Sequence, residues 1–184
     1  IFVPNFTFTF EQSAKIISES PIPVDSHLMI ADPDDRAHLF AKAGSRSVTF
    51  HYEASSNPLE TISKIADEGA RVGVALKPGT PFHEIGSIME HIDMVLIMTV
   101  EPGFGGQSFM GDMMDKVKEA RREIDERFFG KIWLQVDGGI SLETIAEAAQ
   151  SGADTFVAGS AVFKSDDPGG MVDELRALAS KSQA

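Results

Sequence analysis

The chain has 184 residues, enough for one domain with a sizeable core, and its 42% hydrophobic and 24% charged content is typical of a globular protein. Its 28 acidic and 16 basic residues give a formal net charge of −12, which disfavours nucleic acid and anionic membranes as partners. It has no cysteine and no apolar run of the roughly 18–20 residues that a membrane span needs, so disulfides, thiolate metal sites and a membrane helix are excluded.

Short apolar runs alternate with segments of helical periodicity along the chain. The runs predict strands at 22–30, 47–51, 72–76, 94–100, 131–137 and 155–159. The periodic segments predict helices at 34–43, 58–68, 82–91, 112–127, 142–150 and 170–181, several of them ended by glycine. This strict alternation predicts a parallel sheet covered by helices, and the absence of any linker predicts a single domain, 1–184.

Six strand–helix units fit two architectures. One is an open, doubly wound sheet, and the other is a (β/α)₈ TIM barrel, which needs two more units. The chain starts abruptly at Ile1, and residues 6–20 read as a loop that runs into a helix, so we expect an upstream piece. With two units before Ile1, the last two strands become the seventh and eighth of a barrel, where barrels often bind phosphate.

Three glycine-rich turns each follow a predicted strand: "PGFGGQ" at 102–107, "VDGGI" at 136–140 and "VAGSA" at 157–161. Asp-Gly alone is commonly a surface turn, but here Ser141 is placed to cap a following helix. Glycines let a ligand approach main-chain N–H groups closely, and a helix N-terminus adds to the attraction for an anion. Together the turns predict a phosphate site that needs no Lys or Arg, which is compatible with the net charge of −12.

An acid and a histidine stand at strand ends. Asp137 heads its glycine turn, where it faces whatever carries the phosphate, although a turn-forming or helix-capping role is the alternative. In "VDSHLM", alternation puts Asp25 and His27 on the same side of a strand. Taken alone, His27 is more typical of a core residue. Paired with Asp137 across a barrel mouth, it is a candidate metal ligand or proton shuttle.

The segments "VDSHLMI", "FHYEA", "VALKPGTP", "MTVEPGFGGQSFM", "VDGGI" and "FVAGSAVF" resemble the ribulose-phosphate 3-epimerase family, in order and at the expected spacing. The resemblance covers residues 2–176. It implies a (β/α)₈ barrel that interconverts D-ribulose 5-phosphate and D-xylulose 5-phosphate in the pentose phosphate pathway. It also implies one divalent metal, held by two His and two Asp, and Zn²⁺, Fe²⁺, Mn²⁺ or Co²⁺ all suit such ligands.

Carried over by motif, the resemblance makes His27 and Asp137 metal ligands that also contact the substrate. Asp137 is in addition the catalytic acid/base on one face of the sugar. The remaining substrate contacts fall on the three glycine turns, at Gly103, Phe104, Gly105, Gly106, Gly138, Gly139, Gly159 and Ser160. The family's substrate-binding Ser, its other metal-binding His and its second catalytic Asp precede "FVPN", so we expect them upstream of Ile1.

Other readings stay open. The barrel could act on a hexulose phosphate such as allulose 6-phosphate, or it could be an inactive, truncated sugar-phosphate binder. A decarboxylase or isomerase of another pathway would need a Lys at a strand end, and Lys77 in "LKPGTP" is the candidate, although the following proline suggests a turn. We expect a small sugar phosphate as partner, a homo-oligomer, and a cytoplasmic location, because the lack of cysteine fits a reducing compartment.

Overall fold

The computed structural model describes residues 3, 7–103 and 106–183. The chain groups into two compact units. The first comprises Ile1–Leu76 and His83–Val95, and the second comprises Lys77–Phe82 and Leu96–Ala184. The expectation of a single domain stays a prediction.

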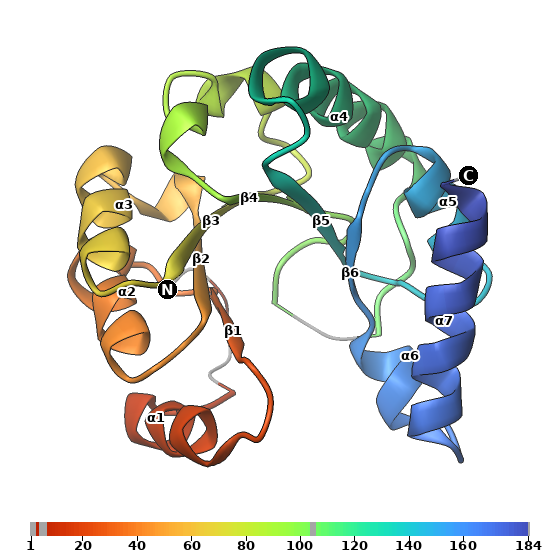
Figure 1. Cartoon of the computed structure of the whole chain (residues 1–184), viewed down its shortest axis with the longest axis horizontal. Helices are drawn as coiled ribbons and strands as arrows, with labels where there is room; N and C mark the ends of the chain where they lie inside the picture. The colour runs from red at the N-terminus through yellow and green to blue at the C-terminus, as the bar shows by residue number, and fades with distance from the viewer. Residues whose placement is uncertain (1–2, 4–6, 104–105, 184) are drawn as a thin grey trace. The chain divides into compact units, whose positions relative to one another are not determined.

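The first unit is built from strand–helix repeats (Figure 1). The strands are parallel, and their register pairs His27 with Thr49 and Thr49 with Gly73. Short 3₁₀ turns follow the second and third strands. In chain order the elements are α1 (Phe10–Glu19), β1 (Asp25–Leu28), α2 (Pro33–Lys42), β2 (Ser47–His51), η1 (Tyr52–Ala54), α3 (Pro58–Asp67), β3 (Arg71–Leu76), η2 (Phe82–Ile85) and η3 (Met89–His91).

The second unit continues the same alternation, and the unit boundary falls within β4. Strand order in the sheet follows chain order from β1 to β6. No helix among the described residues is both long and apolar enough to cross a bilayer. The elements are β4 (Met94–Met98), η4 (Gly111–Met113), α4 (Met114–Phe128), β5 (Trp133–Asp137), α5 (Ile145–Gln150), β6 (Thr155–Val157), α6 (Gly159–Phe163) and α7 (Pro168–Ser182).

The pleat of β1–β3 separates an apolar face from a polar one. Val48, Phe50 and Val74 are fully buried and supply the apolar surface that amphipathic helices such as α3 require. On the opposite face, Thr49 and His51 are also fully buried. Fully buried polar side chains are unusual unless they belong to a hydrogen-bond network or to a functional site. The polar face of β1 and β2 is also the face that carries the candidate site residue His27.

The predicted strands all form, and most predicted helices form within a few residues of the expected limits. The helix expected at 82–91 is wrong, because two separate 3₁₀ turns, η2 and η3, occupy that stretch. Gly86 and Ser87, which favour helices poorly, lie between the two turns. Ser141 does not cap the helix after the "VDGG" turn, because α5 begins at Ile145 with Thr144 as its N-cap.

Asp34, in the first turn of α2, ties this helix to the segment after β2. Its carboxylate accepts hydrogen bonds from the Ser56 amide (2.9 Å), the Ser56 hydroxyl (2.6 Å), the Thr61 hydroxyl (2.7 Å) and the Ser55 hydroxyl. Partial burial raises the pKa of Asp34, but these hydrogen bonds outweigh burial and hold the pKa well below its usual range. The ionised carboxylate therefore stabilises the fold.

We predict that Asp34→Ala lowers the free energy of unfolding at pH 7 by about 2–3 kcal/mol, because several charge-assisted hydrogen bonds are lost. A depressed pKa means that this contribution is present above the unfolded-state value of about 3.9 and disappears as the pH falls below it. Urea unfolding of wild type and variant at pH 7 and near pH 3 measures both effects. A difference of equal size at the two pH values would contradict the role of the ionised form.

Candidate functional site

Buried Thr99 joins the turn after β4 to the turn that carries Asp137. Its amide donates to the Asp137 carbonyl (2.8 Å), and its hydroxyl donates to the Gly138 carbonyl (2.7 Å). The Thr99 carbonyl in turn accepts from the Met110 amide (2.9 Å). Thr99 itself is fully buried. Thr99 therefore holds the backbone of Asp137 and Gly138 at the end of β5.

Close packing explains the two glycines that follow the acid. A Cβ atom at Gly138 would lie 2.6 Å from Val100 Cγ2, and one at Gly139 would lie 2.6 Å from the Phe109 amide nitrogen. Both glycines also have positive φ angles, 129° and 67°. Any other residue would clash and be strained. The "DGG" turn is thus required by the backbone of the neighbouring loop as well as by any ligand.

The other two glycine turns lie next to each other in the same unit. A Cβ atom built on Gly106 would lie 3.8 Å from the Ser160 hydroxyl. Gly159 begins α6 directly behind β6, and a Cβ there would meet nothing within 4 Å. The loop after β4 thus packs against the "DGG" turn at Phe109 and passes beside Ser160 at Gly106. The predicted contacts at Phe104 and Gly105 lie outside the described residues.

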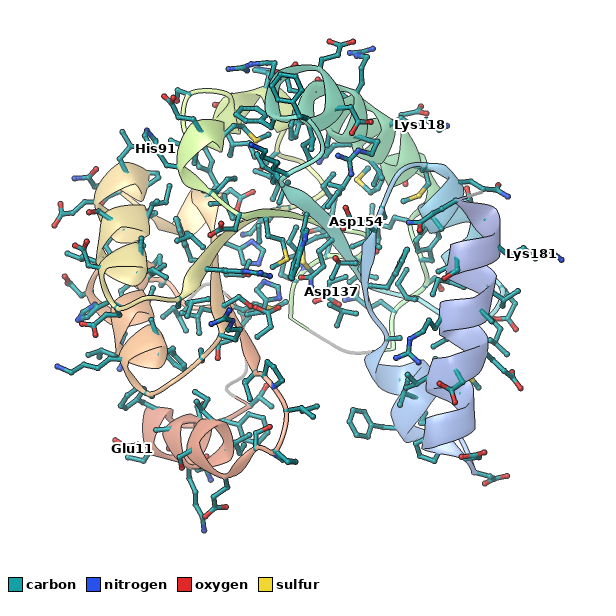
Figure 2. All side chains as sticks on the ribbon, viewed as in Figure 1. Glu11, His91, Lys118, Asp137, Asp154 and Lys181 are labelled. Atoms are coloured by element: carbon teal, nitrogen blue, oxygen red, sulfur yellow. The ribbon has the colours of Figure 1, made fainter. Side chains whose placement is uncertain are left out.

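Two aspartates mark opposite ends of the β5–β6 pair (Figure 2). Asp154 precedes β6, where its carboxylate accepts from the Leu134 amide (3.0 Å) and pairs with Arg121 (3.2 Å). Asp137 ends β5 and is half-buried, paired in register with Val157. Asp154 therefore has a structural role at the amino end of the strands, whereas Asp137 stands at the carboxyl end, where parallel α/β folds place their ligands.

In the first unit, His27 lies against a second histidine. The register places Asp25 and His27 on the same face of β1, as predicted. His27 Nε2 is 3.0 Å from Nε2 of fully buried His51, and His51 Nδ1 is 3.4 Å from a Glu53 carboxylate oxygen. The sequence pattern alone singles out neither His51 nor Glu53 as a site residue. Only the turn of η1 brings Glu53 back to the strand end.

The donors present suit a divalent cation. Imidazole nitrogen and carboxylate oxygen are ligands that Zn²⁺, Fe²⁺, Mn²⁺ and Co²⁺ accept, and a ligating His is normally held through its other ring nitrogen, as His27 is by His51. Among the described residues, no group of three or more His, Cys, Asp or Glu gathers at one point. His27 belongs to the first unit and Asp137 to the second. Their pairing at one metal therefore stays a prediction.

Lys77, the candidate for a different chemistry, lies in a turn. Its carbonyl accepts from the Thr80 amide (3.1 Å) and from the Lys116 ammonium (3.0 Å). This is the turn that the following proline suggested.

We predict that Gly138→Ala and Gly139→Ala each destabilise the protein by several kcal/mol, because the added methyl group meets Val100 or Phe109 and the φ angle is strained. Gly159→Ala is the matched control, because the methyl group there enters open space. Thermal unfolding of the three variants provides the comparison. Equal stability of all three would show that the turn is not packed in this way.

Structural relatives establish the fold. The chain superposes on KGPDC from Streptococcus mutans with a TM-score of 0.72 at 16% identity, covering 95% of this chain and 80% of that one. It also matches N-(5'-phosphoribosyl)anthranilate isomerase from Pyrococcus furiosus with a TM-score of 0.61 at 20% identity, covering 95% and 82%. The fold is that of a (β/α)₈ TIM barrel, to which the described residues contribute a sheet of six strands.

Sequence relatives establish the family. Residues 1–163 match the Ribulose-phosphate 3 epimerase family. The ribulose-phosphate 3-epimerase of Mycobacterium leprae is 44% identical over 97% of this chain and 79% of its own length. The ribulose-phosphate 3-epimerase of Escherichia coli K12 is 43% identical over 86% of this chain and 70% of its own length. This chain therefore belongs to the ribulose-phosphate 3-epimerase family of enzymes.

Proposed function

We propose that the protein epimerises C3 of a ketopentose 5-phosphate, interconverting D-ribulose 5-phosphate and D-xylulose 5-phosphate. Membership of the family supports this activity. The observation that carries the proposal is the position of Asp137, fixed by Thr99 at the carboxyl end of β5 and followed by the glycine turn. The enzyme would serve the pentose phosphate pathway in the cytoplasm, as a homo-oligomer.

Asp137 acts as the acid/base on one face of the sugar. Inverting a carbon beside a carbonyl group requires removal of its proton and return of a proton to the opposite face through a planar enediolate. One carboxylate reaches only one face, so a second acid serves the other. The backbone bonds of Thr99 keep Asp137 in place during the transfer, and a positioned base contributes roughly 10²–10⁴-fold to the rate.

The glycine turns bind the substrate phosphate. Main-chain amides at Gly138, Gly139 and Ser160 supply donors without a basic surface, which suits a chain with a net charge of −12. The loop after β4 packs against the Gly138–Gly139 turn and passes beside Ser160, so it unites the three segments. Binding the remote phosphate holds the sugar in register with Asp137.

His27 and Asp137 hold a divalent metal in this proposal. When bound, the cation would stabilise the negative charge that develops on the enediolate oxygens, a contribution of several kcal/mol. His27 contributes a neutral imidazole nitrogen from the first unit and Asp137 a carboxylate oxygen from the second. The protein's own residues transfer the proton and bind the phosphate.

We predict that Asp137→Asn lowers kcat at least 10³-fold while inorganic phosphate still binds, because the amide keeps the shape of the turn but exchanges no proton. Asp154→Asn is the matched control, since that carboxylate bonds Leu134 and Arg121 at the opposite end of the same strands. Its kcat should stay close to wild type below the unfolding temperature.

The same assay, run on D-ribulose 5-phosphate and on allulose 6-phosphate side by side, tests which sugar phosphate is the substrate. Preference for the hexulose phosphate would overturn the pentulose assignment.

We predict that His27→Ala loses the metal, because an imidazole nitrogen is removed from the ligand set. Elemental analysis of the purified full-length protein gives the stoichiometry of Zn, Fe, Mn and Co. His83→Ala, at an exposed histidine, is the control and should keep the wild-type content. Full metal content in His27→Ala would contradict the ligand role.

A further inference from the structure

Three side chains form a continuous line in the first unit, from Glu53 through His51 to His27. Glu53 Oε2 lies 3.4 Å from His51 Nδ1, and His51 Nε2 lies 3.0 Å from His27 Nε2. The ring centroids are 5.0 Å apart, and the ring planes are inclined by 27°. His51 is fully buried and the Glu53 side chain is 20% exposed. Nothing in the proposed function uses His51 or Glu53.

Burial makes the contact between the two imidazoles informative. A part-buried nitrogen pair at 3.0 Å needs one proton between the two atoms, so one ring donates from Nε2 and the other accepts there. Without a third group, either ring could be the donor. The negative carboxylate of Glu53, 3.4 Å from His51 Nδ1, removes this symmetry, because it attracts a proton to the nearer ring nitrogen. It favours a proton on His51 Nδ1, which leaves the lone pair of His51 on Nε2.

We infer that His51 and Glu53 are positioning residues that hold His27 as its Nε2–H tautomer and so present the Nδ1 lone pair of His27 to the metal. This inference rests on the proposed function, in which His27 is a ligand. The order of protons follows from the two distances: the Glu53 carboxylate, 3.4 Å from His51 Nδ1, favours a proton on that nitrogen, and His51 Nε2 then accepts from His27 Nε2–H. The nitrogen of His27 that carries no proton is then Nδ1.

The segment that carries Glu53 is itself anchored. The 3₁₀ turn η1 starts directly after His51 and is closed by the bond from the Ser55 amide to the Tyr52 carbonyl (3.2 Å). Beyond it, the Asp34 carboxylate holds Ser55 and Ser56. The turn is thus fixed at both ends, by β2 and by α2. Glu53 therefore returns to His51 through a rigid backbone.

Such partners matter because a metal binds the deprotonated nitrogen of a neutral imidazole. A ring that is held in the right tautomer binds without first moving its proton, and loss of such partners typically costs 10–100-fold in metal affinity. The two states of an unbiased histidine pair differ in which nitrogen of His27 is protonated. Glu53 is the group that selects between them.

The test begins with the metal-free, full-length wild-type protein. ¹⁵N-imidazole NMR at a fixed neutral pH reports which nitrogen of each histidine carries the proton. We expect Nε2–H for His27 and Nδ1–H for His51. A protonated Nδ1 on His27 would overturn the inference. This measurement requires no metal, so it stands even if the proposed metal site fails.

Variants then link the tautomer to metal binding. His51→Phe should give a mixed tautomer at His27 and weaken Zn²⁺ binding 10–100-fold in chelator competition. His51→Gln should recover most of the affinity, because its amide donates to Glu53 while its carbonyl accepts from His27. Glu53→Gln should give the mixed tautomer with His51 in place, since an amide can donate or accept. His83→Gln, on an exposed ring, is the matched control and should change nothing.

The outcomes separate the two proposals. Unchanged Zn²⁺ affinity in both His51→Phe and Glu53→Gln would overturn the positioning role. Wild-type protein that shows Nε2–H on His27 but binds no Zn²⁺ would support the tautomer assignment and overturn the proposed metal site instead. Because Glu53→Gln changes a side chain at the edge of the fold, it tests the inference even if His51→Phe does not fold.

Discussion

One buried threonine fixes the position of the candidate catalytic acid. Thr99 gives its amide to the Asp137 carbonyl and its hydroxyl to the Gly138 carbonyl, so the ends of β4 and β5 are bonded to each other beyond the sheet. The acid therefore depends on backbone contacts for its place. These contacts set the carboxylate at the carboxyl end of the strand, where the proposed chemistry needs it.

The same constraint explains why glycine must follow the acid. The loops after β4 and β5 can approach so closely only if no Cβ atoms lie between them, which Gly138 and Gly139 satisfy at Val100 and Phe109. The Gly138–Gly139 turn, which resembles a ligand-binding motif, is therefore also required by packing. The two purposes are compatible, because the absence of side chains that lets one loop pack also leaves main-chain amides accessible to an anion.

The aspartates have different roles at different places in the fold. Asp34 and Asp154 are surrounded by hydroxyl, amide and guanidinium donors, and they stabilise the junctions that they bridge. For Asp34, hydrogen bonds outweigh burial and keep the pKa low, as suits a structural carboxylate. In the histidine pair on β1 and β2, the neighbouring Glu53 carboxylate has a different role, because we infer that it selects the tautomer of the two rings.

Much of the fold followed from the sequence because its signals are local. Alternating apolar runs and amphipathic segments predicted every strand, and glycines after α2, α3 and α5 marked helix ends. Prediction from local signals failed where helical periodicity and helix-disfavouring residues occur in the same segment. Residues 82–91 carry helical periodicity but are interrupted by Gly86 and Ser87, and the five-residue helix α6 is too short to produce a periodic pattern.

The candidate site likewise has features that local sequence signals predict and features that only tertiary contacts decide. The sequence by itself determined that Asp137 and His27 stand at strand ends, because a strand's end and the side of each residue follow from chain-local rules. Only the tertiary structure showed that Gly106 lies beside Ser160, that Thr99 holds Asp137, and that Glu53 and His51 line up on His27. These contacts join segments that are distant in sequence or reversed by a turn, and their geometry is set by parallel strand register and loop packing, which no local pattern encodes.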